Sequence, residues 1–429
     1  MSERAESPPR LVLTTGEMAH GPHAIARDAG KVVFVRGAAP DEEIEVVVTE
    51  ERRAYAYGEL IAVRRPSPWR RKPPCPYLPR CGGCPWQHLD YAGQLRAKAA
   101  NARQQLARLG GLDVPIADIV PSPHEYGYRQ RLKLRVDGEA VGFLAGASHT
   151  VVPVADCLLA EPVIRATVPA VGAFVATLAA RVRRVEIIAT GSGERVVVAA
   201  EVESRWLDAD DAAIRRWLAT QRHVAGLVFH GRRWRRVWGD DRLTLHPEPE
   251  LSLVVRAGTF TQVNRAANEL LVQAVNAIVD PCSGAHVLDL YAGAGNFALP
   301  LARRGARVTA VERHPQAAED GSANAVRLGL TQCRFVCGDA ARVARELAAA
   351  ATPVDAVVLD PPRSGAAEVL PALLRLAPPR VCYVSCDLAT LARDLKALAA
   401  RYRIDGVQPF DLFPHTYHVE TVTSATLTC

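Results

Sequence analysis

The run RVCYVSC at 380–386 ends in Cys386, and a stretch with helical periodicity, LATLARDLKALAA, begins just two residues later. The apolar run predicts a buried strand, and the periodic stretch predicts a helix. Ligands of open α/β sheets bind at the carboxyl ends of the strands. Cys386 therefore stands where a thiolate nucleophile could act. A small buried cysteine with only a packing role is the alternative at this point.

A second candidate site is the glycine loop in DLYAGAGNFA, which places Gly293 and Gly295 after another predicted strand. Glycines allow a sharp turn and a close approach of the backbone to a ligand. Glu312 closes the next predicted strand, where a carboxylate can accept hydrogen bonds from ribose hydroxyls. The loop also satisfies a relaxed dinucleotide pattern, so NAD is one possible ligand. The carboxylates Asp289 and Asp339 favour a cationic cofactor, S-adenosylmethionine, over a pyrophosphate.

The segment DPPRSG at 360–365 ends a fourth predicted strand. Its two prolines remove two backbone donors and leave carbonyls exposed beside Asp360. Amino-group methyltransferases use a similar turn, with an aromatic residue in place of Arg363. An arginine is suited to a phosphate or a pyrimidine carbonyl. A strand-end turn with a surface arginine is the alternative.

Four cysteines have a spacing that suits a metal centre. Three of them are close together in CPYLPRCGGC and the fourth follows in VADCLLAEP; they are Cys75, Cys81, Cys84 and Cys157. Four thiolates can hold either Zn²⁺ or an iron–sulfur cluster. The sequence pattern alone leaves both possibilities open.

Three regions with different patterns must position these residues. Short alternating runs at 11–65 predict a small, OB-like β-barrel. A Pro-rich bridge, a helix at 90–110 and scattered strands at 66–255 predict a central α+β domain. Regular alternation of strands and helices at 256–429 predicts a doubly wound, Rossmann-like α/β domain. We expect the helix at 90–110 to pack on this last domain.

Composition narrows the class of protein. The chain has 429 residues, 49% of them hydrophobic, and a net charge of +6. No apolar segment follows the start MSERAESPPR and none is long enough to span a bilayer, so we expect a cytoplasmic monomer without membrane contact. Basic stretches with interleaved aromatics at 64–80 and 230–238 are typical of nucleic-acid binding. A solvated surface is the alternative for each.

The chain resembles the RNA 5-methyluridine methyltransferases that use S-adenosylmethionine, and the motifs that carry the resemblance are DPPRSG, YVSC, DLFPHTYHVE and FTQVN. It is most similar to their three-domain branch, which implies an RNA-binding TRAM barrel at 11–65 and an iron–sulfur domain after it. The resemblance covers nearly the whole chain, because four separate motifs occur in the expected order. It implies a [4Fe–4S] cluster on the four cysteines, and 23S rRNA as the substrate, with the T-loop of tRNA as the alternative.

The resemblance also implies roles for single residues. Cys386 would be the nucleophile and Glu420 the general base. The residues implied to line the cofactor site are Gln262, Tyr291, Asn296, Glu312, Asp339 and Asp360. The chain departs from the family where Asp387 follows the nucleophile in place of asparagine, and a negative charge there would oppose thiolate formation. A cluster-bearing RNA-binding protein without catalysis is the non-enzymatic alternative.

The chemistry of uracil is consistent with such a pair of residues. C5 of uracil is a poor nucleophile, so a group must first add to C6 and convert the ring to an enolate. A thiolate both adds and leaves readily. A base must then remove the C5 proton, which Glu420 could do from a late strand.

Overall fold

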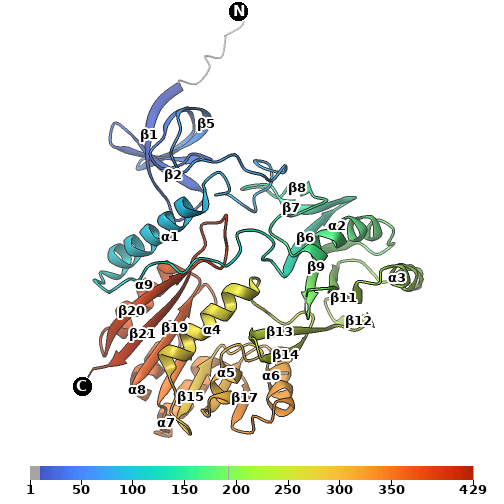
Figure 1. The fold of residues 1–429 in the computed structure, drawn as a ribbon, viewed down its shortest axis with the longest axis vertical. Coiled ribbons are helices and arrows are strands. Elements are labelled where there is room, and N and C mark those ends of the chain that lie inside the picture. The colour runs from blue at the N-terminus through green and yellow to red at the C-terminus, as the bar shows by residue number, and fades with distance from the viewer. Residues whose placement is uncertain (1–9, 192, 429) are drawn as a thin grey trace, which may run out of the picture.

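The computed structural model describes residues 10–191 and 193–428. A small barrel, a central sheet and a larger C-terminal sheet follow one another along the chain. In Figure 1 the barrel lies at the top, the central sheet at the right and the C-terminal sheet at the lower left. Residues 1–9, from which the lack of a signal segment was inferred, and Cys429 lie outside the described residues.

Five strands close into the N-terminal barrel in the order β1-β2-β3-β5-β4, which confirms the predicted small barrel. Their bounds are β1 Arg10–Met18, β2 His23–Asp28, β3 Lys31–Arg36, β4 Glu43–Glu51 and β5 Tyr55–Arg65. The inward positions are small or aliphatic, and Ala24, Val33 and Val35 are fully buried. Small residues are needed there because the interior of a barrel narrows as its strand number falls.

A segment without regular strands, 66–90, leads from the barrel into helix α1, Tyr91–Gln105. Asp90 caps this helix by accepting a hydrogen bond from the backbone N–H of Gly93 at 2.7 Å. The helix continues as a π-helical turn, η1 Leu106–Gly110, and ends at Gly111, whose φ of 61° is left-handed. Leu106 lies in the apolar core of the C-terminal sheet. Ala102 of α1 is buried with Leu388 and Val419 of the C-terminal domain, so α1 packs on that domain, below the barrel in Figure 1.

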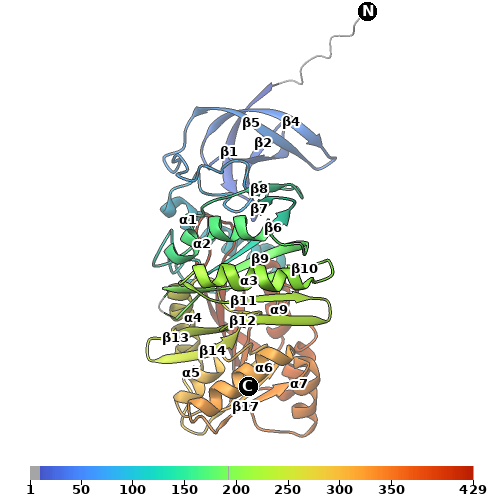
Figure 2. The same ribbon diagram turned by 90° about the vertical axis from the view of Figure 1, so that its right-hand side faces the viewer.

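Seven strands form the central sheet in the order β12-β11-β10-β9-β6-β7-β8. Their bounds are β6 Arg131–Asp137, β7 Ala140–Leu144, β8 Val151–Pro153, β9 Val182–Thr190, β10 Arg195–Val202, β11 Val224–Gly231 and β12 Trp234–Gly239. Helices α2 Pro162–Val175 and α3 Asp208–Thr220 cover one face, as Figure 2 shows. A hairpin, β13 Arg242–Glu248 and β14 Leu251–Arg256, packs on the other face. Burial of both faces explains the continuous apolar run in β10.

The C-terminal sheet has the strand order β17-β16-β15-β18-β19-β21-β20. Its strands are β15 His286–Leu290, β16 Arg307–Glu312, β17 Cys333–Cys337, β18 Ala356–Leu359, β19 Arg380–Ser385, β20 Tyr402–Phe410 and β21 Glu420–Leu427. The first five in this order are parallel, and β21 runs antiparallel to both of its neighbours. The chain runs outward from β15 through β16 to β17 and then crosses to β18 on the other side of β15, so the ligand crevice is expected at the carboxyl end of β15.

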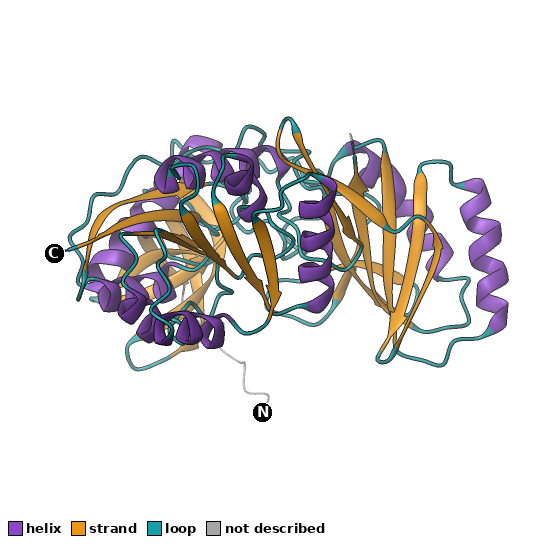
Figure 3. Cartoon of the chain, turned by 90° about the horizontal axis from the view of Figure 1, so that it is seen from below, coloured by secondary structure: helices purple, strands orange, loops and turns teal. Residues whose placement is uncertain are grey.

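Helices cover both faces of the C-terminal sheet, which confirms the predicted α/β class (Figure 3). Helices α7 Ala340–Ala349, α8 Leu370–Leu376 and α9 Leu388–Leu398 share one apolar core. Helices α4 Arg265–Val279, α5 Ala298–Arg303 and α6 Pro315–Arg327 pack on the other face, together with Leu251 and Leu253 of the β13–β14 hairpin. Among the described residues no helix has both the length and the apolar character needed to cross a membrane.

Candidate active site

The register of β19 and β21 brings Cys386 and Glu420 together. Ser385 pairs with Thr421 at the end of the antiparallel ladder, and the Thr421 hydroxyl donates to the Ser385 carbonyl at 3.1 Å. Cys386 and Glu420 are the next residues on each strand, so they face each other across the ladder. Glu420 is only 3% exposed, whereas Cys386 is partly exposed. The thiol is therefore accessible beside a carboxyl group that is not.

Asp360 and Arg363 complete this cluster from the turn after β18. Leu359 pairs with Tyr383 in the parallel ladder, which places Asp360 at the same edge of the sheet as Cys386. Burial raises the pKa of Glu420 well above its usual range, with a further contribution from Asp360, and burial also raises the pKa of Asp360. The exposed Arg363 guanidinium lowers the pKa of Glu420. Two neighbouring carboxyl groups that resist ionisation suit proton transfer near neutral pH.

Glu420, Asp360 and Arg363 also affect the pKa of the Cys386 thiol. The pKa of Cys386 is raised to about 12, chiefly by burial and also by the charges of Glu420 and Asp360, while the charge of Arg363 lowers it. Without ligands, Cys386 is thus a thiol at neutral pH, and its ionisation depends on the charges around it.

Asp387 does not have the role expected from the sequence. Its carboxylate caps α9 by accepting hydrogen bonds from the backbone N–H of Thr390 at 2.9 Å and from the Thr390 hydroxyl at 3.1 Å. The charges that raise the pKa of Cys386 are Glu420 and Asp360, from other strands. Asp387 therefore stabilises the N-terminus of α9, the helix that follows Cys386.

A pocket lies beside this cluster, at the carboxyl end of β15. Five of the predicted cofactor residues line it, namely Gln262, Tyr291, Gly293, Asn296 and Asp360. The backbone between Tyr291 and Gly295 has positive φ at Tyr291, Gly293 and Gly295. At Gly295 a Cβ would lie 2.7 Å from a Leu299 methyl carbon, whereas at Gly293 nothing lies within 4 Å. Gly295 thus permits close packing below the loop, and Gly293 leaves space next to the pocket.

Side-chain amides hold the walls of the pocket. Asn296 and Asn268 exchange two hydrogen bonds, at 2.9 and 3.0 Å, which join the glycine loop to α4. Gln130 donates to the backbone carbonyl of Gln262 at 2.6 Å and so fixes the segment before α4. These contacts orient groups around a ligand before it binds.

Glu312 and Asp339 lie next to the pocket but are not among the residues that line it. The carboxylate of Glu312 accepts hydrogen bonds from the backbone N–H groups of Gly293 at 2.9 Å and His314 at 2.6 Å. Asp339 caps α7 by accepting from the N–H of Arg342 at 2.9 Å. The pKa of Tyr291 is raised to about 12, chiefly by burial and next by the charge of Asp339, so Asp339 is close to the pocket wall.

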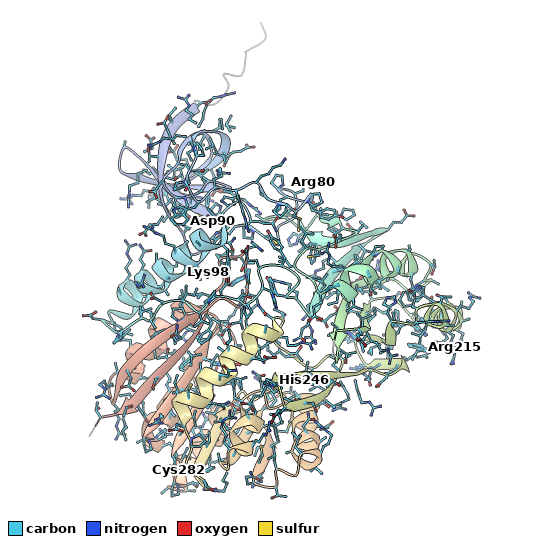
Figure 4. All side chains as sticks on the ribbon, viewed as in Figure 1. Arg80, Asp90, Lys98, Arg215, His246 and Cys282 are labelled. Carbon is cyan, nitrogen blue, oxygen red and sulfur yellow. The ribbon has the colours of Figure 1, made fainter. Side chains whose placement is uncertain are left out.

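The loop that carries Glu420 is tied to α1 through buried polar groups. Lys98, fully buried on α1 and labelled in Figure 4, donates to Asp411 at 2.6 Å and to the Phe413 carbonyl at 3.0 Å. The His415 ring lies 2.9 Å from the Glu125 carbonyl, so its Nε2 carries the proton and donates there. Its Nδ1 therefore accepts from Arg71 and Gln94 at 3.2 and 3.1 Å. These bonds position the loop, and burial lowers the pKa of His415 to about 3.

Four arginines of the two basic stretches have carboxylate partners within the protein, and phosphate binding by the stretches stays a prediction. Arg70 donates to the buried Glu42 at 2.7 Å and to the Gly37 carbonyl at 2.8 Å. Arg71 pairs with Glu125 at 3.2 Å. In the second stretch, Arg235 pairs with Asp241, and Arg236 pairs with Asp211 at 3.2 Å. The partners of Arg70, Arg71 and Arg236 are 25 to 54 residues away in the sequence, whereas the partner of Arg235 is six residues away.

The four predicted ligand cysteines line one further pocket, between the segment 66–90 and the connection from β8 to α2. They are Cys75, Cys81, Cys84 and Cys157. Burial raises the pKa of Cys81, Cys84 and Cys157, and the charges of neighbouring cysteines raise it further. In the described parts of the chain, no three His, Cys, Asp or Glu side chains are arranged so that they could hold a metal ion.

Some residues of the site were not found from the sequence. Asn268 and Gln130 line the pocket from elements far from the glycine loop. His20 of the barrel lies near Asp387 and Arg363, whose charges act on its ring. None of these residues belongs to a local motif, so no signal in the sequence could have identified them.

Profiles of two known families match the chain. The family described as tRNA (Uracil-5-)-methyltransferase matches residues 90–425, and the TRAM domain matches residues 10–61. The first match covers both larger sheets and includes Cys386 and Glu420.

Individual proteins are similar over nearly the full length. The chain is 36% identical to 23S rRNA (uracil(1939)-C(5))-methyltransferase RlmD of Thiobacillus denitrificans, over 94% of this chain and 96% of that protein. It is 34% identical to RlmD of Pectobacterium atrosepticum, over 96% and 92%. The crystal structure of Pyrococcus abyssi tRNA (uracil-54, C5)-methyltransferase, in complex with S-adenosyl-L-homocysteine, aligns with a TM-score of 0.77 at 24% identity, covering 96% of this chain and 99% of that one. This last likeness concerns the fold.

Proposed function

Because the chain belongs to the tRNA (Uracil-5-)-methyltransferase family, we propose that it transfers a methyl group from S-adenosylmethionine to C5 of a uridine in RNA. The observation that carries the proposal is the meeting of Cys386 and Glu420 at the ends of β19 and β21, beside the pocket at the glycine loop. A nucleophile, a base and a cofactor pocket at one sheet edge are what this reaction requires.

Cys386 acts first in the proposed reaction. The thiol first loses its proton to solvent, and the thiolate sulfur then forms a bond to C6 of uracil while the C5=C6 electron pair moves through the ring to the C4 oxygen. C5 thereby becomes an enolate carbon that attacks an electrophile. S-adenosylmethionine, when bound, supplies a methyl group on a positively charged sulfur and leaves as a neutral thioether. Arg363 supports this stage, because its cation favours the thiolate of Cys386.

Glu420 completes the reaction. Its carboxylate takes the proton from C5, the C5=C6 double bond forms again, and the electron pair of the C6–S bond returns to the sulfur of Cys386. The proton on Glu420 then passes to solvent. Burial and Asp360 raise the pKa of Glu420, which makes it a stronger base than an exposed glutamate.

Pocket residues orient the cofactor in this proposal. Gln262, Tyr291 and Asn296 line the pocket, and Asp360 lies between it and Cys386. Glu312 and Asp339 add negative charge at the adjacent strand ends. Such an acidic set suits a sulfonium compound and opposes a pyrophosphate, which argues against the NAD alternative.

The proposed substrate is 23S rRNA, at the position equivalent to the uracil 1939 named for the relatives. To test this, 5-methyluridine is mapped in 23S rRNA and tRNA from cells with the gene, without it, and with a Cys386→Ala copy. We expect the modified nucleotide at one 23S rRNA position only with the intact gene. Loss from tRNA instead would move the substrate to tRNA. An unchanged pattern in both RNAs would favour an RNA-binding protein without catalysis.

The four-cysteine pocket supports a second part of the proposal, a [4Fe–4S] cluster held by Cys75, Cys81, Cys84 and Cys157. A single zinc ion needs four sulfurs at about 2.3 Å from one point. The thiols share a pocket but lack such a close arrangement. A cluster distributes its four thiolates over four iron atoms and therefore fits a wider set.

Metal analysis tests the cluster separately from the reaction. Protein purified without oxygen should be brown and contain about four iron and four sulfide per chain. A Cys84→Ser variant should lose this colour, whereas Cys333→Ser, at a buried cysteine outside the pocket, should keep it. Stoichiometric zinc without visible absorbance would contradict the cluster and leave the methyl-transfer proposal intact.

A cytoplasmic location and a monomeric state stay predictions.

A further inference from the structure

The pocket at the glycine loop has walls of opposite charge. Among the described residues that line it, Asp360 is the one carboxylate and Arg265 the one guanidinium. Asp360 belongs to the turn after β18, and its charge acts on Cys386. Arg265 is the first residue of α4. The negative wall suits a sulfonium group, but the methyl-transfer chemistry does not by itself require a positive one.

Thr261 has an unpaired hydroxyl in the same pocket. Its side chain lines the pocket and is only 5% exposed. Its Oγ1 is buried and has no hydrogen-bond partner in the part of the chain that the structure describes. A buried polar atom without a partner costs free energy. A ligand that forms a hydrogen bond with this hydroxyl would remove that cost.

Contacts on both sides of Thr261 hold its backbone in place. The Thr259 hydroxyl donates to Asp320 of α6 at 2.8 Å. On the other side, the backbone N–H of Gln130 donates to the Val263 carbonyl at 2.9 Å. The segment is thus attached to α6 and to the central domain. The position of the Thr261 hydroxyl is therefore set before a ligand binds.

The N-terminal turn of α4 adds positive charge to the wall that carries Arg265. Asn264 caps this helix by accepting a hydrogen bond from the backbone N–H of Ala267 at 3.2 Å. Arg265 and Asn268 are about one turn apart and both line the pocket, so the first turn of the helix faces it. The positive end of a helix dipole attracts anions. Thr261, Arg265 and this turn therefore provide donors and positive charge for one anionic group.

The Arg265 guanidinium is held in position and has only a weak counter-ion. Its Nη1 donates to the Gly191 carbonyl at 2.5 Å. Glu161 lies 3.6 Å from its Nη2, beyond hydrogen-bond distance. Burial raises the pKa of Glu161 more than the charge of Arg265 lowers it. Because a carboxyl group that resists ionisation neutralises a cation poorly, the charge of Arg265 can act on a ligand.

We propose that Thr261, Arg265 and the N-terminal turn of α4 bind the α-carboxylate of S-adenosylmethionine, while Asp360 faces its sulfonium group. The inference rests on the proposed function in that S-adenosylmethionine is the ligand. Walls of opposite charge fix the orientation of a ligand that carries both charges, so the sulfonium lies at the wall next to Cys386. A phosphate of RNA is the other anion that could bind here, and a cofactor without the carboxylate distinguishes the two.

Isothermal titration calorimetry with two ligands tests this assignment without methyl transfer. S-adenosylmethionine and decarboxylated S-adenosylmethionine differ only in the carboxylate. The wild-type chain should bind S-adenosylmethionine about tenfold or more tightly than the decarboxylated compound, since hydrogen bonds to a charged group are the strong ones. Thr261→Val and Arg265→Met should each reduce this preference, because they weaken binding of S-adenosylmethionine and leave binding of the decarboxylated compound unchanged.

Matched variants separate carboxylate binding from damage to the pocket. Thr261→Ser keeps the hydroxyl and Arg265→Lys keeps the charge, so both should retain most of the preference. Arg303→Met removes an arginine of α5 that pairs with Glu250, and should change neither affinity.

Two results would overturn the carboxylate site and leave the proposed function intact. One is equal affinity of the wild-type chain for both ligands. The other is an equal loss of affinity for both ligands in Thr261→Val and Arg265→Met. A wild-type chain that binds neither ligand would refute the proposed function, and the carboxylate site with it.

Discussion

Replacing Glu420 by Gln should make Cys386 more reactive toward an alkylating agent while it slows methyl transfer. The charge of Glu420 raises the pKa of the Cys386 thiol, after the larger effect of burial. Glutamine keeps the size of the side chain and removes the charge, so the thiolate should form at lower pH. The same change removes the proposed base, and turnover should fall by a factor on the order of 10²–10⁴.

The pairing of β19 with β21 gives the expected size of the change in the Cys386 pKa. Residues that face each other across antiparallel strands have Cβ atoms about 5 Å apart. Two unit charges at that distance interact by about 3 kcal/mol at an effective dielectric constant of about 20, which corresponds to about two pKa units. Because the pKa of Glu420 is itself raised, its charge acts only once the pH exceeds that pKa. The variant should therefore alkylate faster than the wild type wherever Glu420 is ionised, and the two profiles should converge at pH values below the pKa of Glu420.

Alkylation by iodoacetamide, followed by mass spectrometry of the Cys386 peptide, measures this difference at a series of pH values. Cys282 and Cys337 are exposed and serve as internal controls with unchanged rates. A Cys386 profile that is the same in both proteins, or shifted to higher pH in the variant, would refute the assigned contact between Glu420 and the thiol.

Three other predictions concern charges around the site. Lys98→Met should destabilise the protein by about 3–5 kcal/mol in chemical denaturation, because it leaves Asp411 buried without its partner. The double variant Lys98→Met/Asp411→Leu should recover most of the lost stability. An equal loss of stability in the single and the double variant would contradict the pairing. Arg363→Gln should move alkylation of Cys386 to higher pH, since the guanidinium lowers the pKa of the thiol. Arg363→Lys keeps the positive charge and should restore the wild-type pH profile. An unchanged profile in Arg363→Gln would show that Arg363 does not act on the thiol. Arg70→Gln should lower stability and leave the salt dependence of RNA binding unchanged, because Arg70 is paired within the barrel; a flatter salt dependence would return it to the RNA surface.

Local patterns were sufficient to predict the elements and the strand-end residues. The apolar run before Cys386 is strand β19, and the periodic run after it is α9. The glycine loop forms the turn after β15 because positive φ is needed at Gly293 and Gly295. Strand ends of a parallel sheet meet at one edge, so Asp360 was predictable as a neighbour of Cys386 once both were placed after strands.

Contacts between distant segments could not be predicted in this way. The basic stretch around Arg70 has the composition of an RNA-binding surface, and only the fold shows that Glu42 pairs with Arg70. The barrel turn with His20 lies beside Tyr417 and is held by a hydrogen bond from Trp86 to the Gly21 carbonyl, and no motif predicts these contacts. The glycine loop alone also left NAD possible, and the family match decided that question.

The central claim is that Cys386 forms a covalent bond to the uridine and that Glu420 releases it. The most direct measurement incubates the Glu420→Gln variant with RNA and S-adenosylmethionine labelled in the methyl group, then separates the products under denaturing conditions. The account predicts a labelled protein–RNA complex, because methylation occurs and elimination does not, and no such complex with Cys386→Ala. Rapid release of methylated RNA by Glu420→Gln would assign the base to another group, and a labelled complex with Cys386→Ala would contradict the mechanism.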